Sequence, residues 1–300
     1  MIQPGTAPSS PLLLFWSNLH RQAPKLNIPG TNFNIGFTLC SAAFLSCIRL
    51  LMSQVFLHVL QWDPDNIRTG ISTAYSVSII HSIILCAGLS VVLYHQPYNL
   101  LAKLKDAPLD LQEATVALLE FCTGYMVYDF TFMLHESNWT PHPDDYAFLA
   151  HHVVTTLYMS QCKVLGVGHV SAMSLMLTGE LTNPCQSYHA NFEIWYSNVE
   201  DTMSWWHVLH PFAEWIYALA YFIVRGFVGP CQNIHITYVY LVSIKGRQMI
   251  PKYISIPWVV MIWGIILGSI PWTMEALDMV KDGLQVKYHK GYDYGPGFEL

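Results

Sequence analysis

The sequence predicts an all-α, polytopic membrane helix bundle with about seven transmembrane helices, and two observations support this fold class. Of the 300 residues, 53% are hydrophobic and only 11% are charged, whereas a soluble domain carries roughly 25% charged residues. The apolar residues also gather in long segments, and a helix needs about 20 mostly apolar residues to cross a bilayer. These segments leave no room for a separate soluble domain.

The candidate spans follow one another with short connections, and we expect all to be helical because lipid cannot satisfy open backbone groups. The fourth and fifth are short and polar, so the other helices should shield them. Residues 231–250 could extend the sixth helix or lie along the membrane interface. The transmembrane domain then covers residues 35–276, between an N-terminal tail of residues 1–34 and a C-terminal tail of residues 277–300. The spans are expected at residues 35–60, 74–95, 114–135, 147–163, 169–188, 208–228 and 254–276.

Lysine and arginine are unevenly distributed between the two sets of connections. The connections on the side opposite the N-terminus carry one basic residue, Arg68. The C-terminal tail adds Lys281, Lys287 and Lys290 to that side. Because positively charged loops face the cytosol, we expect a cytosolic N-terminus. With an odd number of spans, the basic C-terminal tail lies on the side away from the cytosol, against this rule. An eighth span, or one span fewer, would bring the tail to the cytosolic side. The side of the N-terminus carries nine basic residues: Arg21, Lys25, Lys103, Lys105, Lys163, Arg225, Lys245, Arg247 and Lys252.

Charge and cysteine content exclude several classes of function. The net charge is −6, so no basic face is expected for nucleic acid. The seven cysteines form no CxxC pair, which argues against a zinc site or a disulfide framework. We therefore expect no metal and no resident cofactor.

Ionisable residues inside spans are costly and usually mark function, and the third predicted helix carries such a residue. Cys122, Tyr125, Asp129, Phe132 and Glu136 recur at helical spacing and form one stripe, with Asp129 in the middle of the helix. Asp129 could instead be a structural acceptor that bonds a neighbouring helix.

The fourth predicted helix begins with paired histidines. Thr155 lies one turn after His151, and Thr156 lies one turn after His152, so the four make one broad polar face. Adjacent histidines point about 100° apart on a helix, which favours a proton relay, or one reactive and one supporting histidine, over a shared metal ion. A neutral imidazole can act as general base or nucleophile near pH 7. The alternative is two buried histidines bonded to neighbouring polar groups.

The fifth predicted helix contains Glu180 and, four residues later, Pro184. Proline removes a backbone hydrogen bond and clashes with the carbonyl of Glu180, so we expect a bend with a free carbonyl at mid-membrane. Such irregular backbone is tolerated only beside protein or a cavity. Alternatively, Glu180 only stabilises the bend by bonding a neighbouring group. Asp129, His151, His152 and Glu180 are thus the candidate catalytic residues. The candidate substrate-binding residues are Tyr125, Thr155 and Thr178.

These features together resemble the TLC-domain family, which groups the translocating-chain-associating membrane protein, the longevity-assurance ceramide synthases and the ceroid-lipofuscinosis neuronal protein of the endoplasmic reticulum. The resemblance covers about residues 35–276. It depends on four short motifs in successive spans: Gly124-Tyr125-Met126-Val127-Tyr128-Asp129, His151-His152, Glu180-Leu181-Thr182-Asn183-Pro184, and Arg225 to Pro230.

The resemblance implies a six-helix core around a lipid-accessible chamber, residence in the endoplasmic reticulum and a role in lipid homeostasis. In ceramide synthases the paired histidines begin a longer signature with a His-Asp and a second Asp. Counted from His151, these positions fall on Thr178, Gly179 and Thr182, and none matches. The sequence is therefore more similar to the smaller TLC-domain proteins than to a true ceramide synthase.

Two functions remain open at this stage. In the first, His151 or His152 activates an amine or hydroxyl of a lipid or sphingoid acceptor, or takes the acyl group itself, with acyl-CoA as co-substrate. In the second, the same residues hold a lipid or fix the bundle of a non-enzymatic lipid-binding, membrane-composition or cargo-handling protein. Membrane lipid, including a fatty acyl chain, is the expected partner in both. A seven-helix receptor and a di-iron oxygenase are disfavoured because their motifs are missing.

Overall fold

The described part of the chain folds almost entirely into helices. The computed structural model describes residues 10–28, 34–63, 67–141, 143, 145–196 and 206–286. Within these ranges the extended pairings are two isolated bridges, Asn27–Asn34 and Lys103–Val167, so the prediction of an all-α fold is confirmed. The helices are α1 (Pro11–Gln22), α2 (Gly36–Gln54), α3 (Ile67–His95), α4 (Leu109–Glu136), α5 (Asp145–Leu165), α6 (His169–Glu180), α7 (Asn183–Tyr196), α8 (Trp206–Tyr221), α9 (Gly229–Thr237), α10 (Ile244–Met249), α11 (Lys252–Gly268) and α12 (Ile270–Val286).

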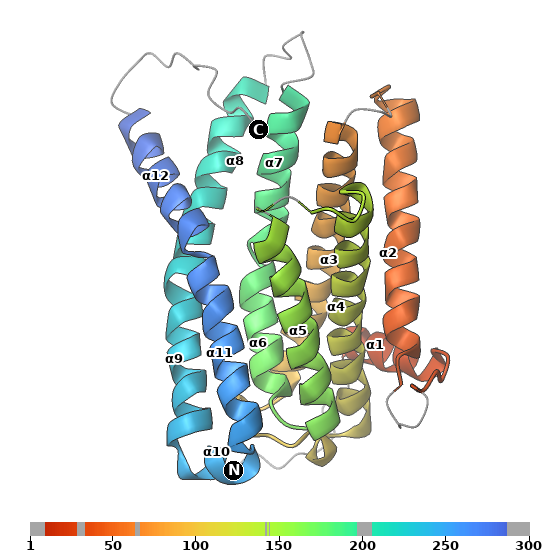
Figure 1. Ribbon diagram of the computed structural model, residues 1–300, viewed down its shortest axis with the longest axis vertical. Helices are drawn as coiled ribbons and strands as arrows, with labels where there is room; N and C mark the ends of the chain where they lie inside the picture. Colours follow the sequence, from red (N-terminus) through yellow and green to blue (C-terminus); the bar gives the residue numbers. More distant parts are fainter. Residues whose placement is uncertain are drawn as a thin grey trace.

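The long helices run alongside one another, parallel to the longest axis of the molecule (Figure 1). Among the described residues, three segments are long and apolar enough to cross a membrane: Gly36–Val59, Thr69–His95 and Lys252–Lys281. This fits a membrane protein. The count of about seven spans stays a prediction, because the other long helices carry more polar residues.

The sixth predicted span is longer than expected. α8 and α9 are joined by a π-helical turn, Phe222–Val228, and a second such turn extends α9 to Val242. Of the two alternatives for residues 231–250, the extension of the sixth helix is therefore correct as far as Val242. Arg225, predicted to be a loop charge, lies inside this helix. The wider π-helical turn directly before Pro230 lets the chain pass a residue without an N–H.

Both segments predicted as tails contain helix. α1 lies within residues 1–34 and packs against α4, with Leu13 and Trp16 buried. α12 continues beyond residue 276 as far as Val286. Residues 1–9, 29–33 and 287–300 of the predicted tails lie outside the described residues.

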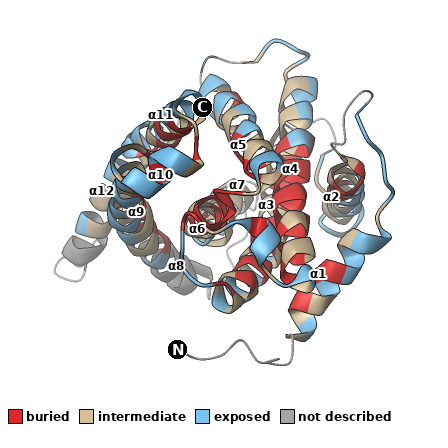
Figure 2. Cartoon of the chain, turned by 90° about the horizontal axis from the view of Figure 1, so that it is seen from below, coloured by how far each residue is buried: buried red, intermediate tan, exposed pale blue. Residues whose placement is uncertain are grey.

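α4 is the central helix of the described bundle. Every residue from Ala117 to Met126 is buried, and α1, α2, α3 and α5 all pack against α4 (Figure 2). α6 is mostly buried as well, as expected for a polar span that other helices shield. α5 differs, because Val153, Leu157 and Val164 expose one of its faces.

The five carboxylates of α4 determine much of this arrangement, because each is paired with a basic side chain from a neighbouring helix. Two partners come from α1, one from α2 and two from α5. A carboxylate inside a bundle is costly unless it is paired and hydrogen-bonded, so these pairs select which helix faces which side of α4. The pairs are Asp110–Arg21, Glu113–His20, Glu120–Lys163, Asp129–His152 and Glu136–Arg49.

The pair between His20 of α1 and Glu113 near the start of α4 predicts that the stability of the protein depends on pH. Burial opposes the charged form of His20, but its contacts with Glu120 and Glu113 outweigh burial and raise the pKa of His20 above 6.5. The stabilisation is therefore complete below pH 6.5 and is lost as the pH rises through the raised pKa. Between pH 6 and pH 9, we expect the wild type to lose roughly 2–4 °C more in apparent melting temperature than His20→Gln. His58→Gln, at an exposed histidine, should behave as the wild type, and equal pH profiles for wild type and His20→Gln would contradict the prediction.

The contact of α2 with α4 predicts a steric effect at one glycine. A Cβ atom on Gly124 would lie 2.6 Å from Cβ of Ser41 and 2.7 Å from the backbone oxygen of Thr38, so α2 must move to admit it. Gly124→Ala should lower the free energy of unfolding by about 1–3 kcal/mol. In the matched control Gly264→Ala, the new methyl group meets no atom within 4 Å. This control should be neutral or stabilising by up to about 1 kcal/mol. Equal melting temperatures for the two variants would show that the helices do not approach this closely.

Candidate functional site

Asp129 and His152 meet between α4 and α5. The Nε2 atom of His152 lies 2.9 Å from Oδ2 of Asp129, and its Nδ1 atom lies 2.6 Å from the backbone oxygen of Phe148. His152 is buried, and the side chain of Asp129 is 20% exposed. Both ring nitrogens thus face oxygen acceptors, and the ring satisfies both contacts when it carries two N–H groups. In that form His152 is a cation paired with Asp129 and has no free nitrogen to act as a base.

His151 points in a different direction from its neighbour. The two rings meet edge to face, with centroids 5.7 Å apart. Among the described residues, no hydrogen bond to the half-buried ring of His151 is found, and the buried hydroxyl of Thr155, one turn later, also has no described partner. If one of the pair reacts, the geometry favours His151 as the reactive histidine and His152 as the supporting one.

Tyr125 connects this pair to a third histidine, which the sequence analysis did not single out. The rings of His81 on α3 and Tyr125 are stacked 3.8 Å apart, with an interplanar angle of 9°. Tyr125 and His152 have ring centroids 6.5 Å apart. His81 is fully buried, and neither of its nitrogens has a hydrogen-bond partner among the described residues. A histidine within the apolar run of residues 79–84 was the signal that could have revealed it.

Glu180 lies beside His81 at the end of α6. Ser82 donates to its Oε2 atom at 2.5 Å, and Asn183 donates to the same oxygen at 3.0 Å. Nδ1 of His81 is 3.7 Å from that oxygen. The carboxylate therefore joins α3, α6 and the start of α7. Its link to the histidine pair passes through His81 and Tyr125.

The predicted break near Pro184 is present, between the end of α6 at Glu180 and the start of α7 at Asn183. Because the helix stops there, the carbonyl of Gly179 loses its helical partner. Nη2 of Arg225 donates to that oxygen at 2.7 Å and reaches Oδ1 of Asn183 at 3.4 Å. The free carbonyl at Glu180 stays a prediction, and the structure adds that the neighbouring carbonyl of Gly179 is bound by an arginine.

Thr178 is directed toward a different helix. Its hydroxyl donates to Oε1 of Gln232 at 3.0 Å and also to the backbone oxygen of Ser174 at 2.9 Å. Gln232 donates back to the hydroxyl of Ser174. These bonds join α6 to α9, so Thr178 belongs to a separate polar bridge rather than to the cluster around His152.

An apolar pocket of about 230 Å³ lies between α2, α4 and α5. It approaches the cluster along α5, because Thr156 lines it one turn after His152. Among its lining residues are Leu39, Leu119 and Met159, and Glu120 and Lys163 lie at the same pocket. Within the described residues, no group of three or more His, Cys, Asp or Glu side chains is arranged to hold a metal ion.

Comparison with known proteins identifies the family. The family model described as the TLC domain matches residues 73–278, which include Asp129, both histidines of the pair, Glu180 and Arg225. No curated protein and no solved structure matches the chain. Because the match covers more than half of the chain, the protein belongs to the TLC-domain family.

Proposed function

We propose that this protein transfers a fatty acyl group from acyl-CoA to a lipid or sphingoid acceptor within the membrane. The TLC domain and the apolar helices already indicate a membrane protein linked to lipid biology. The observation that carries the finer proposal is the contact between His152 and Asp129, which leaves His151 without a partner among the described residues.

In the proposed reaction, His151 is the general base. It takes the proton of the acceptor hydroxyl or amine, and the acceptor oxygen or nitrogen attacks the thioester carbonyl of acyl-CoA. The bond between the carbonyl carbon and sulfur breaks, and His151 returns its proton to the leaving thiolate. The products are the acylated lipid and free coenzyme A.

The remaining groups position the base and the substrate. The cation of His152, held by Asp129, lies beside the ring of His151 and can stabilise negative charge that develops on the carbonyl oxygen. Thr155 offers, on the same face of α5, a hydroxyl that has no partner among the described residues. The apolar pocket that reaches Thr156 provides the surroundings that an acyl chain prefers.

A second candidate is a non-enzymatic protein that binds lipid or alters membrane composition. The observation that favours it is that two ionisable groups of the cluster already have protein partners: Glu180 bonds Ser82 and Asn183, and His152 bonds Asp129 and the backbone of Phe148. In this alternative the polar residues fix the bundle and hold a headgroup. In both cases we place the protein in the endoplasmic reticulum, with its N-terminus in the cytosol.

The acyl-transfer proposal predicts a strong effect of His151→Ala. With purified protein in lipid nanodiscs, acyl-CoA and a panel of sphingoid bases, lysophospholipids and diacylglycerol, release of coenzyme A should fall roughly 100-fold or more, the range of general-base catalysis. His135→Ala, at an exposed histidine of α4, is the matched control and should keep the wild-type rate.

Each alternative has its own outcome in that experiment. Wild-type activity of folded His151→Ala would eliminate His151 as the base. The second candidate would replace the enzyme under two joint results. No coenzyme A is released with any acceptor, and a photoreactive lipid crosslinks to the wild type but not to a variant of Asp129.

The contact between Asp129 and His152 predicts that the two side chains are energetically coupled. Asp129→Asn and His152→Gln should each lower the stability, because each leaves a buried polar partner unmatched. The double variant should be at least as stable as the less stable of the two single variants, with a coupling free energy of roughly 1–3 kcal/mol. Apparent unfolding free energies of the four proteins in the same detergent measure it, and additive losses would show that the two side chains do not interact.

A further inference from the structure

A second pocket lies at the end of the bundle that carries α1 and α10 (Figure 1), and it shares no lining residue with the cluster around His152. Its volume is about 630 Å³. Segments that are distant in sequence form it: residues 103–105 before α4, Gln112 of α4, residues 163–167 at and just after the end of α5, and residues 248–249 of α10. Tertiary packing therefore creates this pocket.

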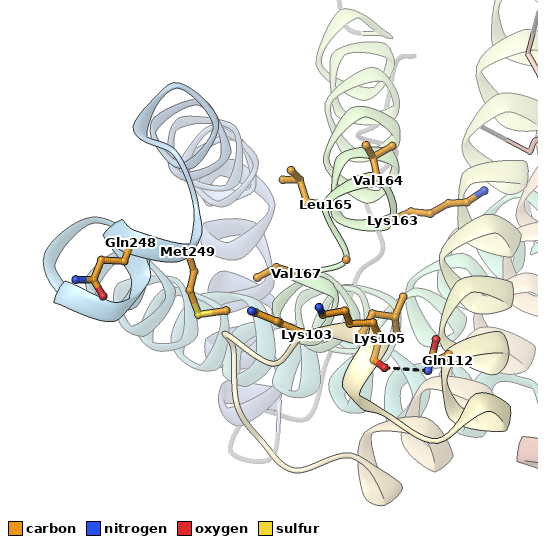
Figure 3. A pocket seen from close by; sticks show the side chains of 11 residues that line it. Lys103, Lys105, Gln112, Lys163, Val164, Leu165, Val167, Gln248 and Met249 are labelled. Atoms are coloured by element: carbon orange, nitrogen blue, oxygen red, sulfur yellow. Dashed lines mark hydrogen bonds between the residues drawn. The ribbon is translucent and has the colours of Figure 1, made fainter. Parts of the chain in front are cut away.

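The lining of this pocket is basic. It contains Lys103, Lys105 and Lys163 and no carboxylate. Lys163 is already committed, because its amine bonds Glu120 and the backbone oxygen of Asn34. Figure 3 shows its amine directed away from the pocket, whereas Lys103 and Lys105 extend their amines toward the open space. Both of these lysines are exposed, and neither amine is bonded to a described residue.

The backbone that carries the two free lysines is held in place. Lys103 forms a bridge with Val167, and the N–H of Leu104 donates to the oxygen of Gly166 at 2.7 Å. The side chain of Gln112 donates to the backbone oxygen of Lys105 at 3.3 Å and to that of Ala107 at 2.7 Å. The backbone of both lysines is thus already ordered, so a ligand has only their side chains to immobilise.

The rest of the lining is mixed. Gln112 and Gln248 contribute amides, and Val164, Leu165, Val167 and Met249 form an apolar wall beside the lysines, with Val164 68% exposed. Two amines beside an apolar wall suit an amphiphilic anion better than a free inorganic ion. Lysine is a common ligand of phosphate, and basic pockets between helices at the cytosolic side of membrane proteins bind phosphorylated headgroups.

We propose that this pocket binds the phosphate-bearing headgroup of an anionic membrane lipid. Lys103 and Lys105 contact the phosphate, and Val164, Leu165 and Met249 lie against the glycerol and the first methylene groups. The phosphate chemistry is shared with soluble phosphate compounds such as coenzyme A, and the apolar wall is the reason to choose the lipid. The inference does not depend on the proposed acyl transfer.

Binding of a fluorescent short-chain phosphatidic acid to the full-length protein in neutral detergent micelles tests the proposal. We expect saturable binding of phosphatidic acid and none of the matching phosphatidylcholine. Lys103→Ala/Lys105→Ala should bind roughly 10- to 30-fold more weakly, about fivefold for each lysine. The control Lys245→Ala/Lys252→Ala removes the same charge near the same end, outside the lining, and should change binding less than twofold.

Three results would overturn the proposal. Equal binding of the two lipids would show that the phosphate is not recognised. An equal loss in the control pair would reduce the effect to general charge attraction. Coenzyme A that binds through Lys103 and Lys105, while phosphatidic acid does not, would assign the pocket to a soluble phosphate compound. Should the alanine pair lower the melting temperature, Lys103→Gln/Lys105→Gln replaces it, because glutamine removes the charge and keeps a long polar side chain.

Discussion

The pairing of the α4 carboxylates is the constraint on which the rest of the bundle depends. The middle of the bundle offers little water to hydrate an ion, so Glu120 and Asp129 there must meet a partner supplied by another helix, while the other three acids of α4 are partly exposed. α4 is buried along its middle, and its five acids take basic partners from α1, α2 and α5. Apolar contacts between helices are non-directional, whereas these pairs favour one rotation of each neighbouring helix about its axis.

A similar rule explains the irregular helices on the other side of the bundle. α6 stops at Glu180 before Pro184, and Arg225 donates to the carbonyl of Gly179 that the interruption leaves free, while the side chain of Asn183 donates to the carboxylate of Glu180. Arg225 itself comes from a π-helical turn inside a long helix. Both irregularities place strong hydrogen-bonding groups deep in the bundle, where the surrounding protein rather than lipid meets them.

The molecule separates two kinds of polar surroundings. The cluster of Asp129, the histidine pair, Tyr125, His81 and Glu180 lies among α3, α4, α5 and α6, where the stacked rings of His81 and Tyr125 and the ion pair of Asp129 with His152 connect its parts. The pocket with Lys103 and Lys105 lies at the end of the bundle, between the connection before α4, the end of α5 and α10. The first environment suits reactions or tight binding away from water, and the second suits exchange of charged groups with a membrane surface.

Composition and helical spacing predicted the all-α bundle, the polar faces around Asp129 and His151 and the break at Pro184, because these depend on residues close together in the chain. The resemblance of four short motifs indicated the TLC family. These sequence patterns did not reveal His81 or Ser82, the direction of Thr178 toward α9, or the continuation of the sixth helix past Arg225. They also could not say which histidine of the pair meets Asp129. These features arise from contacts between helices that are distant in sequence, and only the packing of the whole bundle decides them.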